Sequence, residues 1–239
     1  GGLQSMPRGT GPEIHTWCYP GKPVLPADLE KYSSWLDTIE LKRAQDLVRP
    51  MDRDHFISSH LFLRKVLSLY MGTLPADIVF SRQPSGKPFI SSPSGHDLFF
   101  SMSRSGSAAA VGVSGSLHVG VDLERIDELM PWKDMASSHF PPGEAEMIAG
   151  APDPLKTFYR YWTLREAALK CLGTGLSIPP DKVRVTCAGA GRETFSTITF
   201  ASVGFSDILT GVSILKDDLM LSLVFKRDRG VNAPEIFFM

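Results

Sequence analysis

The sequence has few cysteines, no long apolar run and no excess of either charge. Cys18, Cys171 and Cys187 are its only cysteines, and they form no Cys-x-x-Cys or Cys/His pair with metal-binding spacing. We therefore expect no disulfide framework, and a reducing, cytoplasmic compartment is the simplest location. The longest apolar stretch, residues 108–113, is too short to span a bilayer, so no membrane partner is expected.

Balanced charge and missing motifs exclude several classes of function. The 25 Lys and Arg residues face 26 Asp and Glu residues, which leaves a formal net charge of -1. Such a protein does not attract nucleic acid through bulk charge, and we expect no nucleic-acid partner. The sequence contains no G-x-x-x-x-G-K-[ST] loop, no H-E-x-x-H and no G-x-S-x-G. Their absence disfavours P-loop nucleotide binding, zinc proteases and α/β-hydrolases.

The composition is that of a globular protein. With 239 residues, of which 43% are hydrophobic and 21% charged, the chain can bury a sizeable core as one large domain or two small ones. Residues 1–5, before Met6, lack the basic and apolar regions of a signal peptide. We expect residues 1–12 to be a disordered or cloning-derived tail.

Periodicity predicts an α+β fold in two halves, residues 13–125 and 126–239. Helical spacing and stop residues predict long helices at residues 27–48, 53–71 and 154–172. Strands are predicted at residues 78–81, 98–101, 108–113, 117–123, 183–187, 194–200, 209–215 and 219–225. The proline-rich segment 127–154 is expected to be irregular or short-helical. Each half thus has a long helix followed by strands, which favours a pseudo-repeat on element order alone.

The string Val119-Gly-Val-Asp-Leu-Glu124 carries two carboxylates on a predicted strand. Because side chains alternate along a strand, Asp122 and Glu124 project from one face, about 6.6 Å apart. Two hard carboxylates at this separation can share one Mg²⁺ ion, and Gly120 on the same face would leave space for a ligand. The alternative is a solvated strand end paired with Arg125.

The third predicted helix places Thr163, Glu166 and Lys170 on one stripe. Its buried face would contain Phe158, Tyr161, Trp162, Leu169 and Leu172. Taken alone, Glu166 and Lys170 are most simply a surface ion pair, four residues apart. A carboxylate able to reach an ion held by Asp122 and Glu124, with an ammonium one turn away, would instead suit phosphoryl transfer.

Basic and small residues are scattered through the first half. They are Lys42, Arg53, Arg64, Gly86-Lys87-Pro88 and Ser103-Arg104-Ser105. Together they could bind a polyanion, although each one alone is by default a solvated side chain. His60 falls on the apolar side of the second predicted helix, which favours a core histidine over a ligand.

Together these strings resemble the 4′-phosphopantetheinyl transferases of the surfactin-synthetase-activating (Sfp) type. The matching motifs are Gly120-Val-Asp-Leu-Glu124, Trp162-Thr-Leu-Arg-Glu-Ala-Ala-Leu-Lys170 with Gly173-Thr-Gly-Leu176, Gly86-Lys-Pro88, Phe140 to Glu144 and the helix from Arg53 to Arg64. They span most of residues 40–190 in the family's order, whereas the first 25 residues hardly match.

The resemblance implies an enzyme that moves 4′-phosphopantetheine from coenzyme A to a serine of an apo acyl or peptidyl carrier protein and releases 3′,5′-ADP. It implies two similar α+β halves with the active site in the cleft between them. Asp122, Glu124 and Glu166 would hold Mg²⁺, or Mn²⁺ in its place, on the coenzyme A diphosphate. Such carrier activation serves fatty-acid, polyketide or nonribosomal-peptide biosynthesis.

The same resemblance assigns roles to individual residues. Asp122, Glu166 and Lys170 would be catalytic: Glu166 or a metal-bound water would accept the serine proton, and Lys170 would stabilise or protonate the leaving phosphate. The coenzyme-A-binding positions would be Lys42, Arg53, Gly86, Lys87, Pro88, Ser103 and Arg104. We expect the protein to be a monomer.

Some positions depart from the family pattern. Ser103-Arg104-Ser105 stands where many members have Ser-His-Ser, and His55 stands where many have arginine. Arginine can hold a phosphate bidentately and is always charged, so Arg104 can replace the usual histidine. Arg165 stands where the family often has lysine, a change that we expect to matter less.

Two other functions are open from the sequence. One is a metal-dependent phosphotransferase or phosphodiesterase that acts on another nucleotide through the same carboxylates. The other is a non-catalytic module that binds carrier proteins. The complete set of Asp122, Glu124, Glu166 and Lys170 argues against the second, because a binding module does not need all four.

Overall fold

The computed structural model describes residues 12–21, 31–94, 97–174, 178–188, 193–200, 208–226 and 234–239. They form a mixed α+β fold, as the sequence predicts. Two compact units are present: Gly1–Ser116 with Pro234–Met239, and Leu117–Ala233. The expected tail, residues 1–12, lies outside the described residues except for Pro12.

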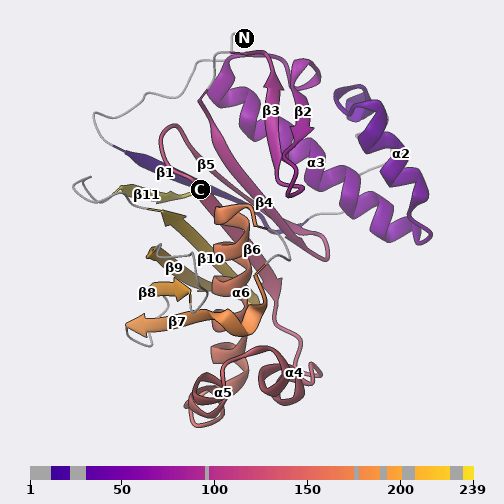
Figure 1. The fold of residues 1–239 in the computed structure, drawn as a ribbon. Coiled ribbons are helices and arrows are strands. Elements are labelled where there is room, and N and C mark those ends of the chain that lie inside the picture. The colour runs from indigo at the N-terminus through magenta and orange to yellow at the C-terminus, as the bar shows by residue number, and fades with distance from the viewer. Residues whose placement is uncertain are drawn as a thin grey trace. The chain divides into compact units, whose positions relative to one another are not determined.

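Within the described residues, the first unit contains a four-stranded sheet, helices and a hairpin (Figure 1). The sheet has the order β11-β1-β5-β4, with β1 (Glu13–Tyr19), β4 (Phe99–Ser105), β5 (Ala108–Ser114) and β11 (Glu235–Phe238). The other elements are η1 (Ser33–Trp35), α2 (Thr38–Asp46), α3 (Pro50–Met71), η2 (Pro75–Asp77), β2 (Val79–Arg82) and β3 (Pro88–Ser92). Helix α3 packs on β5, and α2 packs on α3.

Local capping explains where α2 and α3 begin. The Asp37 side chain accepts a hydrogen bond from the Glu40 backbone N–H, and the Glu40 side chain accepts one from the Asp37 N–H. Pro50 is the first residue of α3, where no intrahelical N–H bond is lost, and Gly72 ends α3 in the left-handed conformation. The predicted helix 27–48 is therefore wrong in part. Within its described residues Lys31 and Tyr32 are helical, η1 and α2 follow, and Pro50 starts a helix rather than ending one.

Three strands of the first unit are missing from the sequence prediction. They are β1, β3 and β11. β1 pairs antiparallel with β5 and parallel with β11, where Glu13 lies opposite Glu235. The pairing of β1 with β11 joins the two ends of the chain, and local periodicity carries no information about such a partner.

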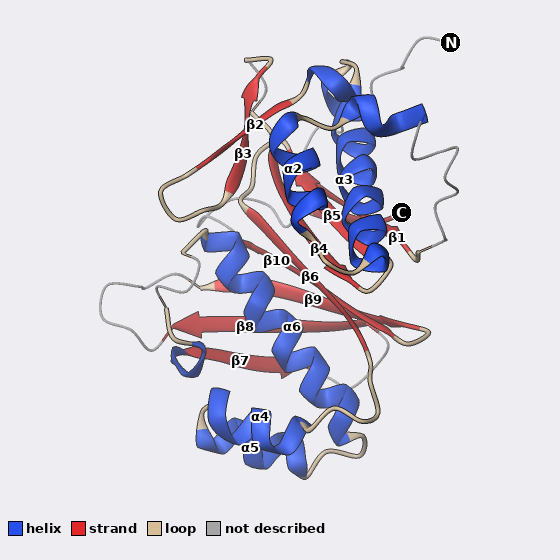
Figure 2. Ribbon diagram, turned by 90° about the vertical axis from the view of Figure 1, so that its right-hand side faces the viewer, coloured by secondary structure: helices blue, strands red, loops and turns tan. Residues whose placement is uncertain are grey.

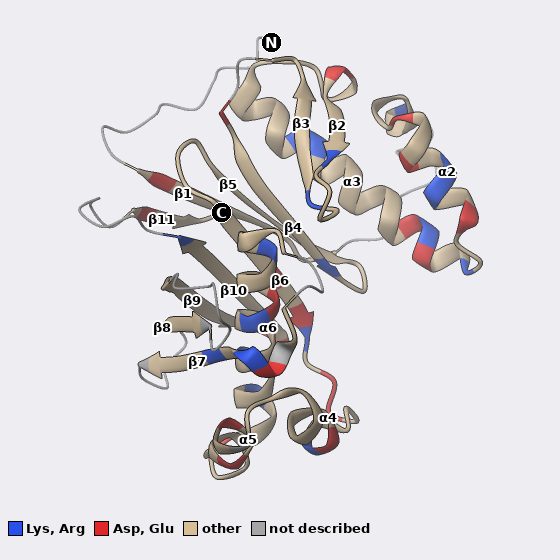
Figure 3. Ribbon diagram, in the orientation of Figure 1, with Lys and Arg blue, Asp and Glu red and all other residues tan. Residues whose placement is uncertain are grey.

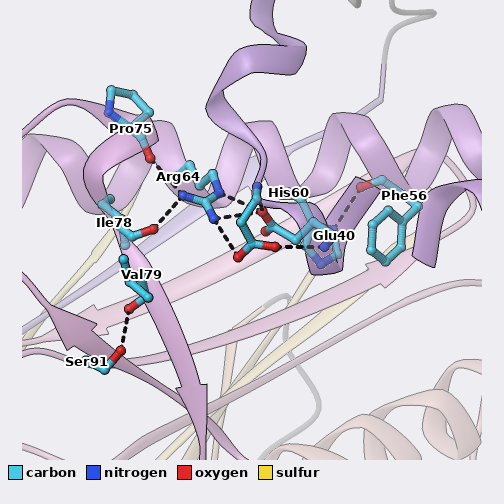
Figure 4. Close-up of polar contacts among 9 residues, drawn as sticks. Glu40, Phe56, His60, Arg64, Pro75, Ile78, Val79 and Ser91 are labelled. Carbon is cyan, nitrogen blue, oxygen red and sulfur yellow. Dashed lines mark hydrogen bonds and ion pairs between the residues drawn. The ribbon is translucent and has the colours of Figure 1, made fainter. Parts of the chain in front are cut away.

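A buried arginine holds α2, α3 and the chain after α3 together (Figure 4). The Arg64 side chain is 0% exposed and lies 2.7 Å from Glu40 Oε2 and 3.2 Å from Asp37 Oδ2. Its Nη1 donates to the carbonyl oxygens of Pro75 and Ile78, at 2.8 and 2.7 Å. Arg64 therefore belongs to the core of the unit and not to an exposed set that could bind a polyanion.

His60 is a core histidine, as its place on the helix predicts. Its Nδ1 donates to the Phe56 carbonyl oxygen at 2.9 Å, and its ring stacks on the Phe56 ring with centroids 3.9 Å apart (Figure 4). Burial, together with the positive charges of Arg104, Arg64 and Arg43, lowers the pKa of His60 to about 4. The imidazole is therefore neutral at neutral pH.

The second unit is a long helix across an antiparallel sheet (Figure 2). The sheet has the order β6-β10-β9-β8-β7, with β6 (Val119–Arg125), β7 (Val183–Ala188), β8 (Glu193–Phe200), β9 (Leu209–Lys216) and β10 (Leu219–Lys226). The helical elements are α4 (Trp132–His139), α5 (Pro142–Ala149), α6 (Pro154–Leu172) and η4 (Pro180–Lys182). The bounds of α6 confirm the predicted third helix, because the Asp153 side chain caps it and Gly173 ends it.

The compact units divide the chain differently from the expected halves. β6 belongs to the second unit because it pairs with β10, and β11 belongs to the first because it pairs with β1. The segment 127–154 contains the short helices α4 and α5. Among the described residues, no helix combines the length and the apolar character that a membrane span requires.

Gly120 sets the distance between β6 and α6. A Cβ atom on Gly120 would lie 1.9 Å from the Ala167 carbonyl oxygen and 2.4 Å from the Cys171 nitrogen. Both are backbone atoms of α6, so no side-chain movement would relieve the clash. The expectation that Gly120 leaves space for a ligand is wrong, because the helix itself occupies that space.

We predict that His60 makes the protein less stable in mild acid. The pKa of His60 is about 4 in the folded protein and 6.5 in the unfolded chain, so only the unfolded chain binds the proton between these pH values. The stability present above pH 6.5 should fall by up to about 3 kcal/mol as the pH approaches 4. Urea unfolding of the wild type and of His60→Phe across this range measures the effect, and parallel curves for the two proteins would contradict it.

We also predict that Gly120→Ala destabilises the protein by about 2 kcal/mol or more, because the added methyl group must push α6 away from β6. Gly115→Ala is the matched control, since a Cβ atom there meets nothing within 4 Å. Chemical denaturation compares the two variants. An equal effect of both substitutions would show that the close approach of α6 to β6 is unimportant.

Candidate active site

The carboxylate strand and the polar stripe of α6 meet in the second unit. Lys170 Nζ donates to Asp122 Oδ1 at 2.7 Å, and the two side chains are 34% and 5% exposed. Asp122 lies on the α6 side of β6, as Gly120 does. Figure 3 shows basic and acidic positions on α6 and β6. Arg125, the alternative partner for the carboxylates, forms an ion pair with Asp218 in the turn between β9 and β10.

Glu166 lies one helical turn before Lys170 and is half-buried. Burial raises the pKa of Glu166, the negative charge of Asp122 raises it further, and Lys170 and Arg165 oppose the rise. Asp122 and Glu166 are therefore close enough to repel each other. Glu166 and Lys170 are therefore not a simple surface ion pair. Their side of α6 faces β6, where Lys170 contacts Asp122.

The acidic residues near β6 have the chemistry of a Mg²⁺ site. Glu124 follows Asp122 by two residues on the same face of β6, and its charge adds to the burial that raises the pKa of Tyr159 on α6. Together with Glu166 they offer hard oxygen donors, and a dication would relieve the repulsion between Asp122 and Glu166. Among the described residues, no three His, Cys, Asp or Glu side chains lie close enough to form a complete metal site. The three-carboxylate metal site stays a prediction.

A buried chain of hydroxyl groups lies beside Asp122 and was not predicted from the sequence. Ser222 is opposite Asp122 in the β6–β10 pairing, and its Oγ lies 2.7 Å from Thr163 Oγ1 and 2.9 Å from Ser213 Oγ. Thr163 donates its proton to the Tyr159 carbonyl oxygen at 2.9 Å, so Ser222 donates to Thr163. The sequence signal that could have revealed it is Ser222, a single serine within the otherwise apolar run of strand β10. These hydroxyl groups connect α6 to β10 and β9 beneath the carboxylates.

Lys42 and Arg53 lie on neighbouring helices of the first unit. Arg53 donates from Nε to the Ala44 carbonyl oxygen at 3.2 Å and from Nη2 to the Leu47 carbonyl oxygen at 3.3 Å. These bonds satisfy carbonyl groups at the C-terminal end of α2, which gives Arg53 a structural role. Lys42 is exposed on α2.

Gly86 and Lys87 lie in the turn of the β2–β3 hairpin, and Pro88 begins β3. The Gly86 N–H donates to the Gln83 carbonyl oxygen at 2.8 Å, and the Gln83 N–H donates to the Lys87 carbonyl oxygen at 2.9 Å. Gly86 has a φ of 91°, which glycine adopts without strain. The turn geometry therefore explains the glycine of this motif, and it places Lys87 at the turn of the hairpin.

Ser103 and Arg104 are neighbours near the end of β4. Ser103 is buried, whereas Arg104 is exposed and its Cζ lies 5.2 Å from the centroid of the Phe56 ring. A cation–π contact of this kind holds the guanidinium group against α3, in the part of the helix that also contains His55 and His60. Arg104 thus combines an exposed charge with a fixed position.

Comparison with known proteins decides the family. Residues 118–216 match the 4′-phosphopantetheinyl transferase superfamily. The chain is 31% identical over 169 residues to the 4′-phosphopantetheinyl transferase HetI of Nostoc sp., an alignment that covers 69% of this chain and 70% of that protein. The chain belongs to the 4′-phosphopantetheinyl transferase superfamily.

Other members of the superfamily give similar matches. A putative 4′-phosphopantetheinyl transferase of Synechocystis sp. is 29% identical over 169 residues, which cover 70% of this chain and 67% of that protein. The 4′-phosphopantetheinyl transferase Sfp of Bacillus subtilis is 26% identical over 169 residues, which cover 70% and 73%. A solved holo-[acyl-carrier-protein] synthase of Thermotoga maritima aligns with a TM-score of 0.38 and 19% identity over 47% of this chain and 65% of that chain, too weakly to support an argument about the fold.

The family assignment confirms the resemblance drawn from the motifs. Gly120–Glu124 and Trp162–Lys170 both fall inside the matched residues 118–216. Gly86–Pro88 and Arg53–Arg64 fall outside them. The roles of the individual site residues stay predictions.

Arg165, where the phosphopantetheinyl transferase family often has lysine, is buried rather than peripheral. Its side chain is 1% exposed, forms an ion pair with Glu144, and donates from Nε and Nη2 to the Val183 carbonyl oxygen at 3.1 and 2.8 Å. Glu144 Oε1 in turn accepts from the Val185 N–H at 3.0 Å. The guanidinium group also lies over the Phe140 ring, with Cζ 4.1 Å from its centroid. Arg165 therefore joins α6, α5 and β7.

We predict that Arg165→Lys destabilises the protein by about 2 to 3 kcal/mol. A lysine has one nitrogen in place of three, so it cannot keep the bonds to both Glu144 and the Val183 carbonyl oxygen. Arg184→Lys on β7, where the arginine is exposed, is the matched control. Equal stability of the two variants in urea unfolding would contradict the importance of this arginine.

Proposed function

We propose that the chain transfers 4′-phosphopantetheine from coenzyme A to the serine hydroxyl of an apo acyl or peptidyl carrier protein. The serine oxygen forms a new bond to the phosphorus that carries the pantetheine arm, the bond to the second phosphate breaks, and 3′,5′-ADP leaves. The single observation that supports this most is the contact of Lys170 with Asp122 beside Glu166. It places an ammonium and two carboxylates together at the motifs that identify the family.

Asp122, Glu124 and Glu166 are the residues that would hold Mg²⁺ or Mn²⁺. All three offer oxygen ligands, and all three lie on β6 or on the helix packed against it. When bound, the ion neutralises charge on the diphosphate of coenzyme A. The buried Thr163, Ser222 and Ser213 hydroxyl groups fix α6 against the sheet, so the carboxylates of the two elements keep their relative places.

Glu166 and Lys170 are proposed to handle the proton and the developing charge. Burial and the charge of Asp122 raise the pKa of Glu166, which makes its carboxylate a stronger base for the serine proton. The Lys170 ammonium would stabilise the negative charge that develops on the departing phosphate oxygen. Both residues are on α6, one turn apart, and can act on the same phosphorus centre.

The first unit is proposed to bind the nucleotide part of coenzyme A. Arg104, Lys87 and Lys42 are its candidate phosphate-binding side chains, and Ser103, Gly86 and Pro88 are the neighbouring candidates. Arg104 has the best support, because it is exposed and the Phe56 ring holds it in place. Arg53 has the weakest support, because two of its nitrogen atoms donate hydrogen bonds to carbonyl oxygens at the end of α2.

We further propose that the two units are versions of one α+β plan. In each unit the first strand pairs antiparallel with a strand that follows the long helix: β1 with β5, and β6 with β10. In each unit a fully buried arginine on the long helix, Arg64 or Arg165, binds a glutamate of the preceding short helix, Glu40 or Glu144. These matched contacts support an internal repeat that the sequence does not reveal by residue identity.

The decisive experiment incubates the protein with coenzyme A, Mg²⁺ and an apo carrier protein, and measures the intact mass of the carrier. We expect a gain of one phosphopantetheine arm on serine. Glu166→Gln should lower the turnover number by about 10² or more with an unchanged unfolding midpoint, because it removes a proton acceptor. Glu146→Gln on α5, where the glutamate is exposed, is the control. Unmodified carrier with the wild type would overturn the proposed function, and full activity of Glu166→Gln would overturn the role of Glu166.

Arg104→Ala should separate two ligands that differ by one phosphate. If Arg104 binds the 3′-phosphate of coenzyme A, the substitution should weaken the binding of coenzyme A by about 1.5 to 3 kcal/mol. The binding of dephospho-coenzyme A should stay nearly unchanged. Calorimetric titration of both ligands with the wild type and the variant measures this difference. Equal weakening of the two ligands, or no weakening of either, would assign the 3′-phosphate to Lys42 or Lys87 instead.

A further inference from the structure

Asp122 has two proposed cationic partners. Its Oδ1 accepts a hydrogen bond from Lys170 at 2.7 Å, and the same carboxylate is one of the proposed metal ligands. An ammonium in hydrogen-bond contact with a carboxylate and a dication ligated by that carboxylate would repel each other strongly. We propose that Lys170 and the metal ion compete for Asp122. Lys170 thereby keeps metal affinity low until the diphosphate of coenzyme A attracts its ammonium away. This inference rests on the proposed function.

The burial of the pair makes this competition strong. The Asp122 side chain is 5% exposed, so water and salt screen the interaction poorly. The Lys156–Asp153 pair on the same helix differs, because its side chains are 49% and 47% exposed. Both pairs have short contacts, at 2.7 and 2.6 Å, but only the buried pair should have a large effect on a nearby ion.

The close packing of α6 on β6 disfavours a backbone movement that would relieve the repulsion. Gly120 lets α6 lie directly on β6, and the Thr163 hydroxyl group is hydrogen-bonded to Ser222 at 2.7 Å. The helix that carries Lys170 is therefore fixed against the strand that carries Asp122. The ammonium must leave by rotation of its own side chain, and the 34% exposure of Lys170 shows that part of this side chain already reaches solvent.

Thermodynamic linkage gives the competition a measurable consequence. If coenzyme A attracts Lys170 to its phosphates, coenzyme A should tighten metal binding, and metal should tighten coenzyme A binding by the same factor. Part of this coupling comes from the direct attraction between the ion and the diphosphate. The remainder comes from Lys170 and should disappear when residue 170 carries no charge.

The test measures Mn²⁺ binding directly, by electron paramagnetic resonance of free Mn²⁺, with and without coenzyme A at pH 8. We expect Lys170→Met and Lys170→Gln to bind Mn²⁺ about tenfold or more tightly than the wild type in the absence of coenzyme A. The tightening by coenzyme A should shrink by the same factor. Lys170→Arg keeps the charge and should bind Mn²⁺ within about threefold of the wild type. Lys156→Met is the matched control and should change nothing.

Unchanged or weaker Mn²⁺ binding in both uncharged variants would overturn the inference, as would a coupling to coenzyme A equal to that of the wild type. Thermal unfolding of each variant confirms that folded protein is compared. Two uncharged variants are used so that the test remains possible if one of them does not fold. Absence of Mn²⁺ binding in every protein would also overturn it. The carrier-modification assay reports separately on the proposed function, so a protein that modifies the carrier but shows no competition contradicts the role of Lys170 alone.

Discussion

The close approach of α6 to β6 is the constraint on which the candidate site depends. A helix normally packs on a sheet through side chains, but at Gly120 the backbone of α6 takes the place of a side chain. This brings the Lys170 ammonium within hydrogen-bond distance of Asp122 and brings Glu166 near enough to feel the charge of Asp122. A wider separation would leave both carboxylates and the lysine as separate solvated groups. The glycine of the motif therefore serves the chemistry by positioning the helix and not by making room for a ligand.

The two buried arginines show how each unit holds its long helix in register. Arg64 and Arg165 each combine a carboxylate with backbone carbonyl oxygens of a segment that follows the helix, Pro75 and Ile78 or Val183. A buried guanidinium group with its partners satisfied fixes both the rotation of the helix and the path of the chain after it. In the second unit this rotation decides which side of α6 faces β6. Arg165, which is next to Glu166 in sequence, contacts Glu144 of α5 and the Val183 carbonyl oxygen of β7.

Local sequence patterns predicted the parts of the structure that depend on local physics. The bounds of α6 follow from the Asp153 cap and the Gly173 stop, and the strand carrying Asp122 follows from its apolar alternation. The strands β1 and β11 could not be predicted in the same way, because their partners are distant in the sequence: β11 pairs with β1, and β1 also pairs with β5. The same limit applies to side chains: Glu166 and Lys170 look like a surface pair on an isolated helix, and only the packing of α6 on β6 shows that Lys170 reaches a buried carboxylate.

The two units solve the same packing problem with different chemistry. In the first unit, Tyr70 of α3 accepts a hydrogen bond from Trp17 Nε1 of β1 at 2.8 Å and lies 2.6 Å from His15 Nδ1. Burial raises the pKa of Tyr70 to about 12 and lowers that of His15, so these two side chains are neutral at neutral pH. The hydrogen bonds of Tyr70 hold helix and strand together, and its neutral partners offer no positive charge to a diphosphate. The second unit places Lys170 and Asp122 at its junction, where removal of one partner would leave a buried charge. The proposed phosphoryl transfer depends on such charges, which agrees with the position of the candidate site in the second unit.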